Sequence, residues 1–403
     1  MTSKGERAGL EAIDEDASVT PLELFFDLVF VFALVQITTF MAADLSWLGL
    51  LHGVLIIGLL WWSWVCYAWV GNVVRADEGL VRLTVFAAMG TMFVLALTIP
   101  EAFDDVPGGL PGPVVVALCY FVFRALHIVL FWLISATDAG LRAQVRRFLP
   151  AMLVGTTLLL IAATVHGTVQ TALWALALLA DYLGNFLGGA RGWRIRSVSH
   201  FAERHGLILI IALGESIASI GVGVVGLPVS WPIVAAAVLG LILSAALWWT
   251  YFDVTSLLAE RAFTACPPDE RARFARDAYS YLHLPLVAGV VLMALGLKKV
   301  LSYVGDTAHH ALTDPLTGVG LFALIGGVVL YLLGHVAFKW RALRILNLPR
   351  AAVALALLGL LAAGPYVPAL AVLTVLTAAV AGLMVFETWR LGPERVRIRH
   401  AEH

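Results

Sequence analysis

About twelve apolar stretches, each long enough to cross a lipid bilayer, constrain this chain more than any other feature of its sequence. A membrane-spanning helix needs about 20 apolar residues, because the hydrocarbon core of a bilayer is roughly 30 Å thick. Turn signals or charged loops separate the stretches, which we place at residues 21–40, 48–70, 81–99, 113–134, 149–165, 169–188, 205–225, 231–252, 279–298, 317–338, 350–364 and 366–387. The sequence therefore predicts an all-α integral membrane protein of about twelve transmembrane helices.

The composition supports this interpretation. Of 403 residues, 61% are hydrophobic and only 13% are charged, whereas soluble proteins carry roughly 25% charged residues. We therefore expect the lipid bilayer to be the main partner, and a net charge of −1 gives nucleic acid no reason to bind. The three cysteines form no CxxC pair, and the chain contains no HExxH, GxSxG or Walker sequence. We expect neither a metal nor a cofactor.

The placement of lysine and arginine predicts the orientation, because these residues collect in cytoplasmic loops. With both termini in the cytoplasm, nearly all of the 26 basic residues fall in cytoplasmic segments, Arg204 and Arg350 among them. Only Lys298 and Lys299 fall in an outside loop, and Arg124 lies within a span. We expect a multi-pass protein of the cytoplasmic membrane, whose basic inner loops attract anionic lipid. The polar, acidic first twenty residues do not resemble a cleavable signal peptide.

Weak similarities between the first and second parts of the chain predict an internal repeat. Tryptophan pairs end both the second and the eighth span, and a histidine lies in both the fourth and the tenth. Six spans in each half would give both halves the same orientation, as in a parallel repeat. The predicted divisions are a flexible acidic tail, a first half, a second half and a basic tail, at residues 1–18, 19–200, 201–389 and 390–403.

Ionisable and polar residues inside the predicted spans are the candidate functional residues. Each charged group costs about 2.5–3.5 kcal/mol to insert, so it usually faces a cavity or a partner. The candidates for a substrate or ion pathway are Glu23, Asp27, Arg124, His127, Asp181, Asn185, Glu203, Glu215, Ser216, His283 and His335. Most of them fall in the cytoplasmic half, whereas Arg124 and Glu215 fall near the bilayer centre. This asymmetry predicts a polar cavity on the cytoplasmic side.

Each of these residues also has a structural interpretation. Glu23 is close enough to the start of its span to cap the helix, and the histidines could simply be satisfied by packing. Arg124 needs a counter-charge, for which Glu215 is the candidate at matching depth. A buried ion pair of this kind can be purely structural.

Several segments carry a family resemblance. The motifs are VTPLELFFDLVFVFAL at 19–34, FAERHGLI at 201–208, ALGES at 212–216 and YSYLHLP at 279–285. Together they resemble the bacterial low temperature requirement protein A family over essentially the whole chain. The resemblance implies a bacterial inner-membrane protein whose signature polar residues are Glu23, Asp27, Glu203, Glu215 and His283. The family takes its name from a cold-growth phenotype, so the resemblance implies no particular biochemical activity.

Three functional hypotheses follow. The first is a transporter or channel for an ion or small solute, in which Glu215 and the histidines relay protons. The second is a membrane-embedded enzyme acting on lipid, with Asp27, Asp181 and His127 as acid, base and orienting group. The third is a structural or sensory membrane protein of cold adaptation. The sequence favours transport and leaves open enzymatic activity, the solute and the oligomeric state, a homo-oligomer included.

Overall fold

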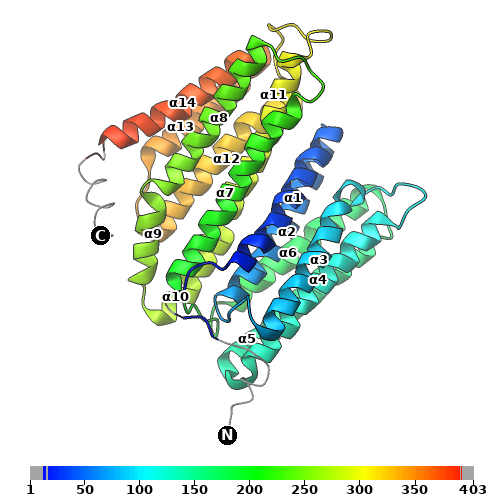
Figure 1. Ribbon diagram of the computed structural model, residues 1–403, viewed down its shortest axis with the longest axis vertical. Coiled ribbons are helices and arrows are strands. Elements are labelled where there is room, and N and C mark those ends of the chain that lie inside the picture. The colour runs from blue at the N-terminus through cyan, green and yellow to red at the C-terminus, as the bar shows by residue number, and fades with distance from the viewer. Residues whose placement is uncertain (1–11, 15–16, 391, 393–403) are drawn as a thin grey trace. The chain divides into compact units, whose positions relative to one another are not determined.

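The computed structural model describes residues 12–14, 17–390 and 392, and within them the fold is helical (Figure 1). The prediction of an all-α protein with twelve spans is confirmed: twelve helices of the described chain are long and apolar enough to cross a membrane. The spans are built on α1 (Pro21–Ala43), α2 (Trp47–Gly71), α3 (Gly79–Leu97), α4 (Gly112–Ile134), α5 (Ala139–Ala162), α6 (Gly167–Gly188), α7 (Val198–Gly223), α8 (Trp231–Phe252), α11 (Leu284–Gly305), α12 (Gly318–Leu343), α13 (Leu348–Ala363) and α14 (Ala369–Arg390).

Shorter helices extend two of these spans. Helix α9 (Thr255–Thr264) follows α8, and helix α10 (Pro268–Phe274) leads through a π-helical turn (Ala275–Tyr281) into α11. A π-helical turn widens the helix by one residue and is often found near functional sites.

The chain divides into two compact units. The first unit takes the chain up to Phe40, then Leu51–Arg204 and Cys266–Arg276. The second unit contains Met41–Leu50, His205–Ala265 and the chain from Asp277 onward. The principal division falls between Arg204 and His205, inside α7. The predicted repeat and its boundaries stay a prediction.

The core of the second unit rests on a close approach of two helices. A Cβ atom added to Gly289, Gly296 or Gly327 would collide with backbone atoms of the facing helix in the α11–α12 pair. Small residues at such crossings let membrane helices pack backbone to backbone.

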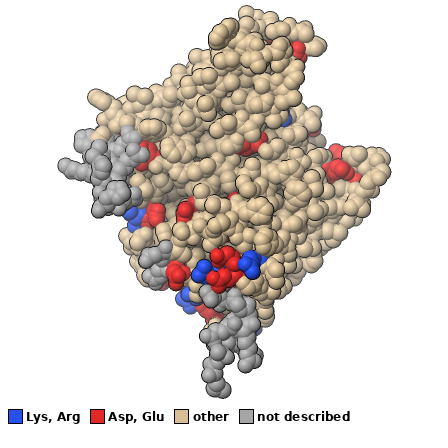
Figure 2. All heavy atoms as spheres, viewed as in Figure 1, with Lys and Arg blue, Asp and Glu red and all other residues tan. Residues whose placement is uncertain are grey.

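Uncharged side chains cover most of the visible surface. Figure 2 shows Lys, Arg, Asp and Glu atoms gathered in a few places, with wide areas between them that carry no charge. Large apolar side chains on the helices are exposed, among them Leu28, Leu83, Val129 and Leu179. A surface of this kind is satisfied by lipid rather than water.

Two of the predicted loop positions were wrong. Lys298 and Lys299 lie inside α11, not in an outside loop, because Val300, Leu301 and Val304 continue the buried face of the helix beyond them. The ammonium group of Lys299 donates to the carbonyl of Ala42 at 3.0 Å. A long lysine side chain can bury its methylene groups while its charge reaches a polar partner.

The start of α7 was also predicted too late. The helix begins at Val198 rather than near residue 205, because Ser197 caps it: its Oγ accepts the N–H of His200 at 3.2 Å. Arg204 therefore lies in a helix and is only 1% exposed. Arg350, the first residue of a predicted span, lies in the first turn of α13 and is 4% exposed.

Candidate functional site

The most concentrated buried charge of the first unit lies where α1 meets the start of α7. Glu23 and Asp27 are one helical turn apart on α1, and both bind the guanidinium of Arg204. Its Nη1 lies 2.9 Å from Glu23 Oε1, and its Nη2 lies 2.8 Å from Asp27 Oδ1. All three side chains are buried: Glu23 is 3% exposed, Asp27 is 0% exposed and Arg204 is 1% exposed. One arginine is thus shared between two buried carboxylates.

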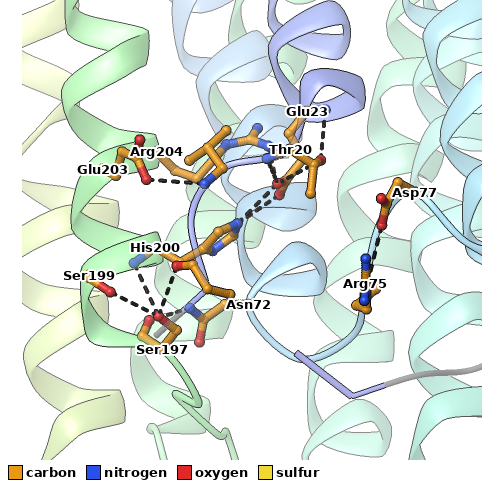
Figure 3. A network of polar contacts seen from close by, with 12 residues as sticks. Thr20, Glu23, Asn72, Arg75, Asp77, Ser197, Ser199, His200, Glu203 and Arg204 are labelled. Carbon is orange, nitrogen blue, oxygen red and sulfur yellow. Dashed lines mark hydrogen bonds and ion pairs between the residues drawn. The ribbon is translucent and has the colours of Figure 1, made fainter. Parts of the chain in front are cut away.

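Three neighbours complete this group. The His200 Nε2 atom lies 3.1 and 3.0 Å from the two carboxylate oxygens of Glu23, and the indole N–H of Trp64 donates to Asp27 Oδ1 at 2.8 Å. Thr20 donates its N–H and its hydroxyl to Glu23 Oε2, each at 3.0 Å, and its Oγ accepts the Glu23 N–H at 3.3 Å. Figure 3 shows Thr20, Glu23, His200 and Arg204 converging. We call Glu23, Asp27, Trp64, His200 and Arg204 the α1–α7 cluster.

The reciprocal Thr20–Glu23 bonds form a capping box, in which a threonine and a glutamate three residues later satisfy the first N–H groups of a helix. Glu23 therefore caps α1, which is one of the two roles weighed from the sequence. Its carboxylate also takes part in the buried cluster.

The charges of the α1–α7 cluster do not balance when His200 is neutral. Two carboxylates then face one guanidinium. Asp27 Oδ2 and His200 Nδ1 are buried and have no hydrogen-bond partner among the described residues. Leaving such atoms unpaired is costly. A single proton added to Asp27 would neutralise the cluster.

A vestibule leads from the surface to Glu23. It has a volume of about 290 Å³ and its polar lining includes Asp14, Thr20, Glu23 and Arg75. It reaches the surface, since the Arg75 side chain is 41% exposed. On the other side of Glu23 lies a cavity of about 10 Å³, lined also by Tyr67 and Arg204. This is room for about one water molecule. Glu23 lines both spaces.

Glu203 lies close to this cluster in sequence but not inside it. It is exposed, and its Oε2 accepts the N–H of Val19 at 3.1 Å. Ser197 makes a similar contact, donating its hydroxyl to the carbonyl of Ala17 at 3.4 Å. Both contacts hold the segment before α1 against the start of α7, where it forms one wall of the vestibule.

A second buried cluster corrects the predicted partner of Arg124. Its Nη2 lies 3.0 Å from Asp181 Oδ1, so Asp181 rather than Glu215 supplies the counter-charge. Tyr120 donates its hydroxyl to the other carboxylate oxygen of Asp181, and Arg124 Nη1 donates to Cys66 Sγ at 3.1 Å. Asn185 donates to the Asp181 carbonyl at 2.6 Å. This cluster is electrically balanced, unlike the α1–α7 cluster.

An aromatic layer lies between the two clusters of the first unit. The Tyr67 ring packs 5.2 Å from Phe26 and 4.6 Å from Phe123, measured between ring centroids. Tyr67 also contacts His127, at 5.9 Å. His127 is 1% exposed, and neither ring nitrogen has a hydrogen-bond partner in the described part of the chain.

The other predicted residues belong to the second unit and lie in separate networks. Ser219 donates to Glu215 Oε1 at 2.8 Å, and Ser216 shares a hydrogen bond with Ser244 at 2.8 Å. His283 Nε2 lies 2.8 Å from the Tyr251 hydroxyl. His335 contacts the guanidinium of Arg350, which also binds Glu387.

The sequence did not indicate Arg204, His200 or Trp64 as site residues. The sequence pattern that could have indicated His200 and Arg204 is their spacing, because residues four apart lie on one face of a helix. It could not be recognised while the helix was thought to begin at residue 205. Within the described residues, no group of three or more His, Cys, Asp or Glu side chains is placed to hold a metal ion.

The twelve apolar helices of the described chain, with charge clusters buried among them, define a multi-pass α-helical membrane protein. Residues 18–385 match the family described as bacterial low temperature requirement A protein, and the chain belongs to this family. It is 30% identical over 343 residues to the uncharacterized protein RA0937 of Rhizobium meliloti (strain 1021), a match that covers 80% of this chain and 78% of that protein. No solved structure matches the chain significantly.

Proposed function

We propose that this protein is a proton-coupled transporter of an ion or small solute in the bacterial cytoplasmic membrane, and that the α1–α7 cluster binds the coupled proton. The observation that carries the proposal is the sharing of Arg204 between Glu23 and Asp27 beside a vestibule. Ionisable groups buried in a membrane protein are expensive, and they commonly mark ion pathways and proton relays.

The shared arginine supplies a two-state element. When both carboxylates are charged, Arg204 is held between them. Protonation of Asp27 weakens one of its two ion pairs and leaves Glu23 as its only full counter-charge. Because Glu23 and Asp27 belong to α1 and Arg204 to α7, the change in attraction acts on the packing of two helices. Transport requires this kind of coupling between a binding event and a helix rearrangement.

The surrounding charges favour this assignment. On α1 the group facing Asp27 is Glu23, on α7 it is Arg204 with His200 beyond it, and on α2 it is the neutral Trp64. At the vestibule, Arg75 is engaged by Glu78 at 3.1 Å and by Asp77 at 3.6 Å. Asp14 is the remaining charged group of the vestibule lining. The negative character of the cluster is therefore not cancelled by a second basic residue in the vestibule.

The orientation predicted from lysine and arginine places the vestibule on the cytoplasmic side, with both termini in the cytoplasm. The proton would enter the cluster from that side or leave toward it. The other buried charge cluster of the first unit is the Arg124–Asp181 pair. The aromatic layer of Phe26, Tyr67 and Phe123 lies between it and the α1–α7 cluster.

The enzymatic hypothesis receives less support. It required Asp27, Asp181 and His127 to act together. Asp27 is bound by Arg204, whereas Asp181 is bound by Arg124 and Tyr120 in the other cluster. The three side chains do not converge on one reacting position.

The test is proton binding and proton-coupled flux by the purified protein. In detergent, potentiometric titration between about pH 5 and pH 8 should show one fewer proton bound by Asp27→Asn than by wild type. In liposomes, a gradient of a transported solute should drive proton movement in wild type and not in the variant. Glu203→Gln, which removes an exposed carboxylate beside the cluster, is the matched control. Equal proton binding by wild type and Asp27→Asn would overturn the proposal.

A further inference from the structure

The second unit has an apolar groove on its surface between α8 and α14. Its volume is about 580 Å³, and its walls are aliphatic or aromatic apart from Thr388. Ala245 and Ala246 of α8 and Ala381 of α14 form part of the lining, and Trp249 and Trp389 lie at the ends of the two helices. The small alanine side chains leave a hollow where larger residues would fill the seam between the helices.

We infer that this groove binds one acyl chain of an anionic phospholipid. Both walls belong to membrane-spanning helices, so the groove faces the hydrocarbon region. A volume of several hundred Å³ with apolar walls and a few polar groups is typical of a ligand site. Ordinary contact with fluid lipid needs no such hollow, because a convex helix surface is covered equally well.

The tryptophans give the direction in which the lipid lies. Trp249 precedes the end of α8 by three residues and Trp389 precedes the end of α14 by one, and Trp389 is 80% exposed. Tryptophan is enriched at the depth of the lipid headgroups. The headgroup therefore lies near Trp389, and the acyl chain runs along Ala381 and Ala245 toward the bilayer centre.

Positive charge at the same end of α14 favours an anionic lipid headgroup. Glu387 is bound by Arg350 at 2.6 Å and lies within the electrostatic reach of Lys339. Arg390 follows Trp389 directly and is exposed. The basic residues Lys339, Arg350 and Arg390 outnumber the carboxylate of Glu387, which leaves an excess of positive charge at this end of α14. Basic clusters at membrane interfaces attract anionic lipid headgroups.

The experiment compares lipids on the purified full-length protein. Phosphatidylglycerol and phosphatidylcholine with the same acyl chains are added to protein in a mild detergent, and the thermal midpoint of unfolding is measured. Mass spectrometry measures the phospholipid that co-purifies. For wild type we expect phosphatidylglycerol to raise the midpoint by several degrees more than phosphatidylcholine, with phospholipid retained through purification.

Three variants separate the parts of the inference. Ala245→Phe fills the groove from an exposed position that tolerates added bulk, and it should lose the retained lipid and the shift. Ala356→Phe, at an exposed alanine of α13 that does not line the groove, should keep both. Arg390→Gln should keep the lipid but reduce the preference for phosphatidylglycerol. Equal lipid retention by Ala245→Phe and Ala356→Phe would overturn the site, and equal stabilisation of wild type by the two lipids would overturn the anionic headgroup.

Discussion

Asp27 and Arg204 form an ion pair of 2.8 Å although 177 residues separate them in the chain. The pair connects α1 to the first turns of α7, just before the division between the two compact units. Asp27 has a second carboxylate oxygen without a partner among the described residues, and Arg204 has a second carboxylate in Glu23. The pair is therefore adjustable, because either residue can change its bonding without losing every partner.

The Arg204→Met variant should be strongly destabilised. It keeps the length of the side chain but leaves Glu23 and Asp27 buried without their shared counter-charge. Removing one partner of a buried ion pair costs about 3–5 kcal/mol. Thermal unfolding in detergent measures the loss, and Glu203→Gln should unfold close to wild type. A midpoint for Arg204→Met within a degree of wild type would mean that the cluster contributes nothing to stability.

The Asp27→Asn variant should fold and yet lose proton coupling. The amide oxygen can still accept from Trp64 and Arg204, and the exchange brings the charges of Glu23 and Arg204 into balance. We expect a midpoint near that of wild type, together with solute movement that no longer depends on a pH gradient. Flux through liposomes at several imposed pH gradients measures this. Unchanged pH dependence would assign the coupled proton to another residue.

The sequence predicted the spans well because length and apolarity alone determine them. It also predicted Glu23 and Asp27 as candidates, since a carboxylate inside an apolar run is conspicuous. It missed Arg204 because the first turns of α7 are polar, and a search for apolar residues begins the helix after them. The true start depends on a serine cap and on the buried partners of the polar turns.

The pairing of Arg124 could not be derived from the sequence for a different reason. The topology gives the depth of a residue in the membrane but not which helices are neighbours. Glu215 has the matching depth, whereas Asp181 lies on a helix that packs beside Arg124. Which helix is the neighbour follows from side-chain packing across the whole unit, and no local pattern encodes it.

Gly71→Ala should destabilise the α1–α7 cluster, because the added methyl group on α2 would push against it. A Cβ at this position would collide with Glu23 Oε1 and would lie 3.6 Å from the His200 ring. The Glu23 carboxylate cannot move aside cheaply, because Thr20, His200 and Arg204 all hold it. Overpacking of this kind costs about 1–3 kcal/mol. Gly90→Ala is the control, since a Cβ there meets no atom within 4 Å. Thermal midpoints should fall for Gly71→Ala and not for Gly90→Ala, and equal midpoints would contradict the close approach.

The Arg124–Asp181 pair should behave as a unit in a double-mutant cycle. Arg124→Met leaves the Asp181 carboxylate buried without a counter-charge. Asp181→Leu leaves the Arg124 guanidinium buried without a counter-charge. Each single variant should lose about 3–5 kcal/mol of stability. The double variant places two apolar side chains against each other, so its loss should be smaller than the sum of the two and smaller than either alone. Removing the half-exposed charge of Arg75 by Arg75→Gln should change stability by less than about 1 kcal/mol. Additive losses in the double variant would show that Arg124 and Asp181 do not depend on each other for their charge balance.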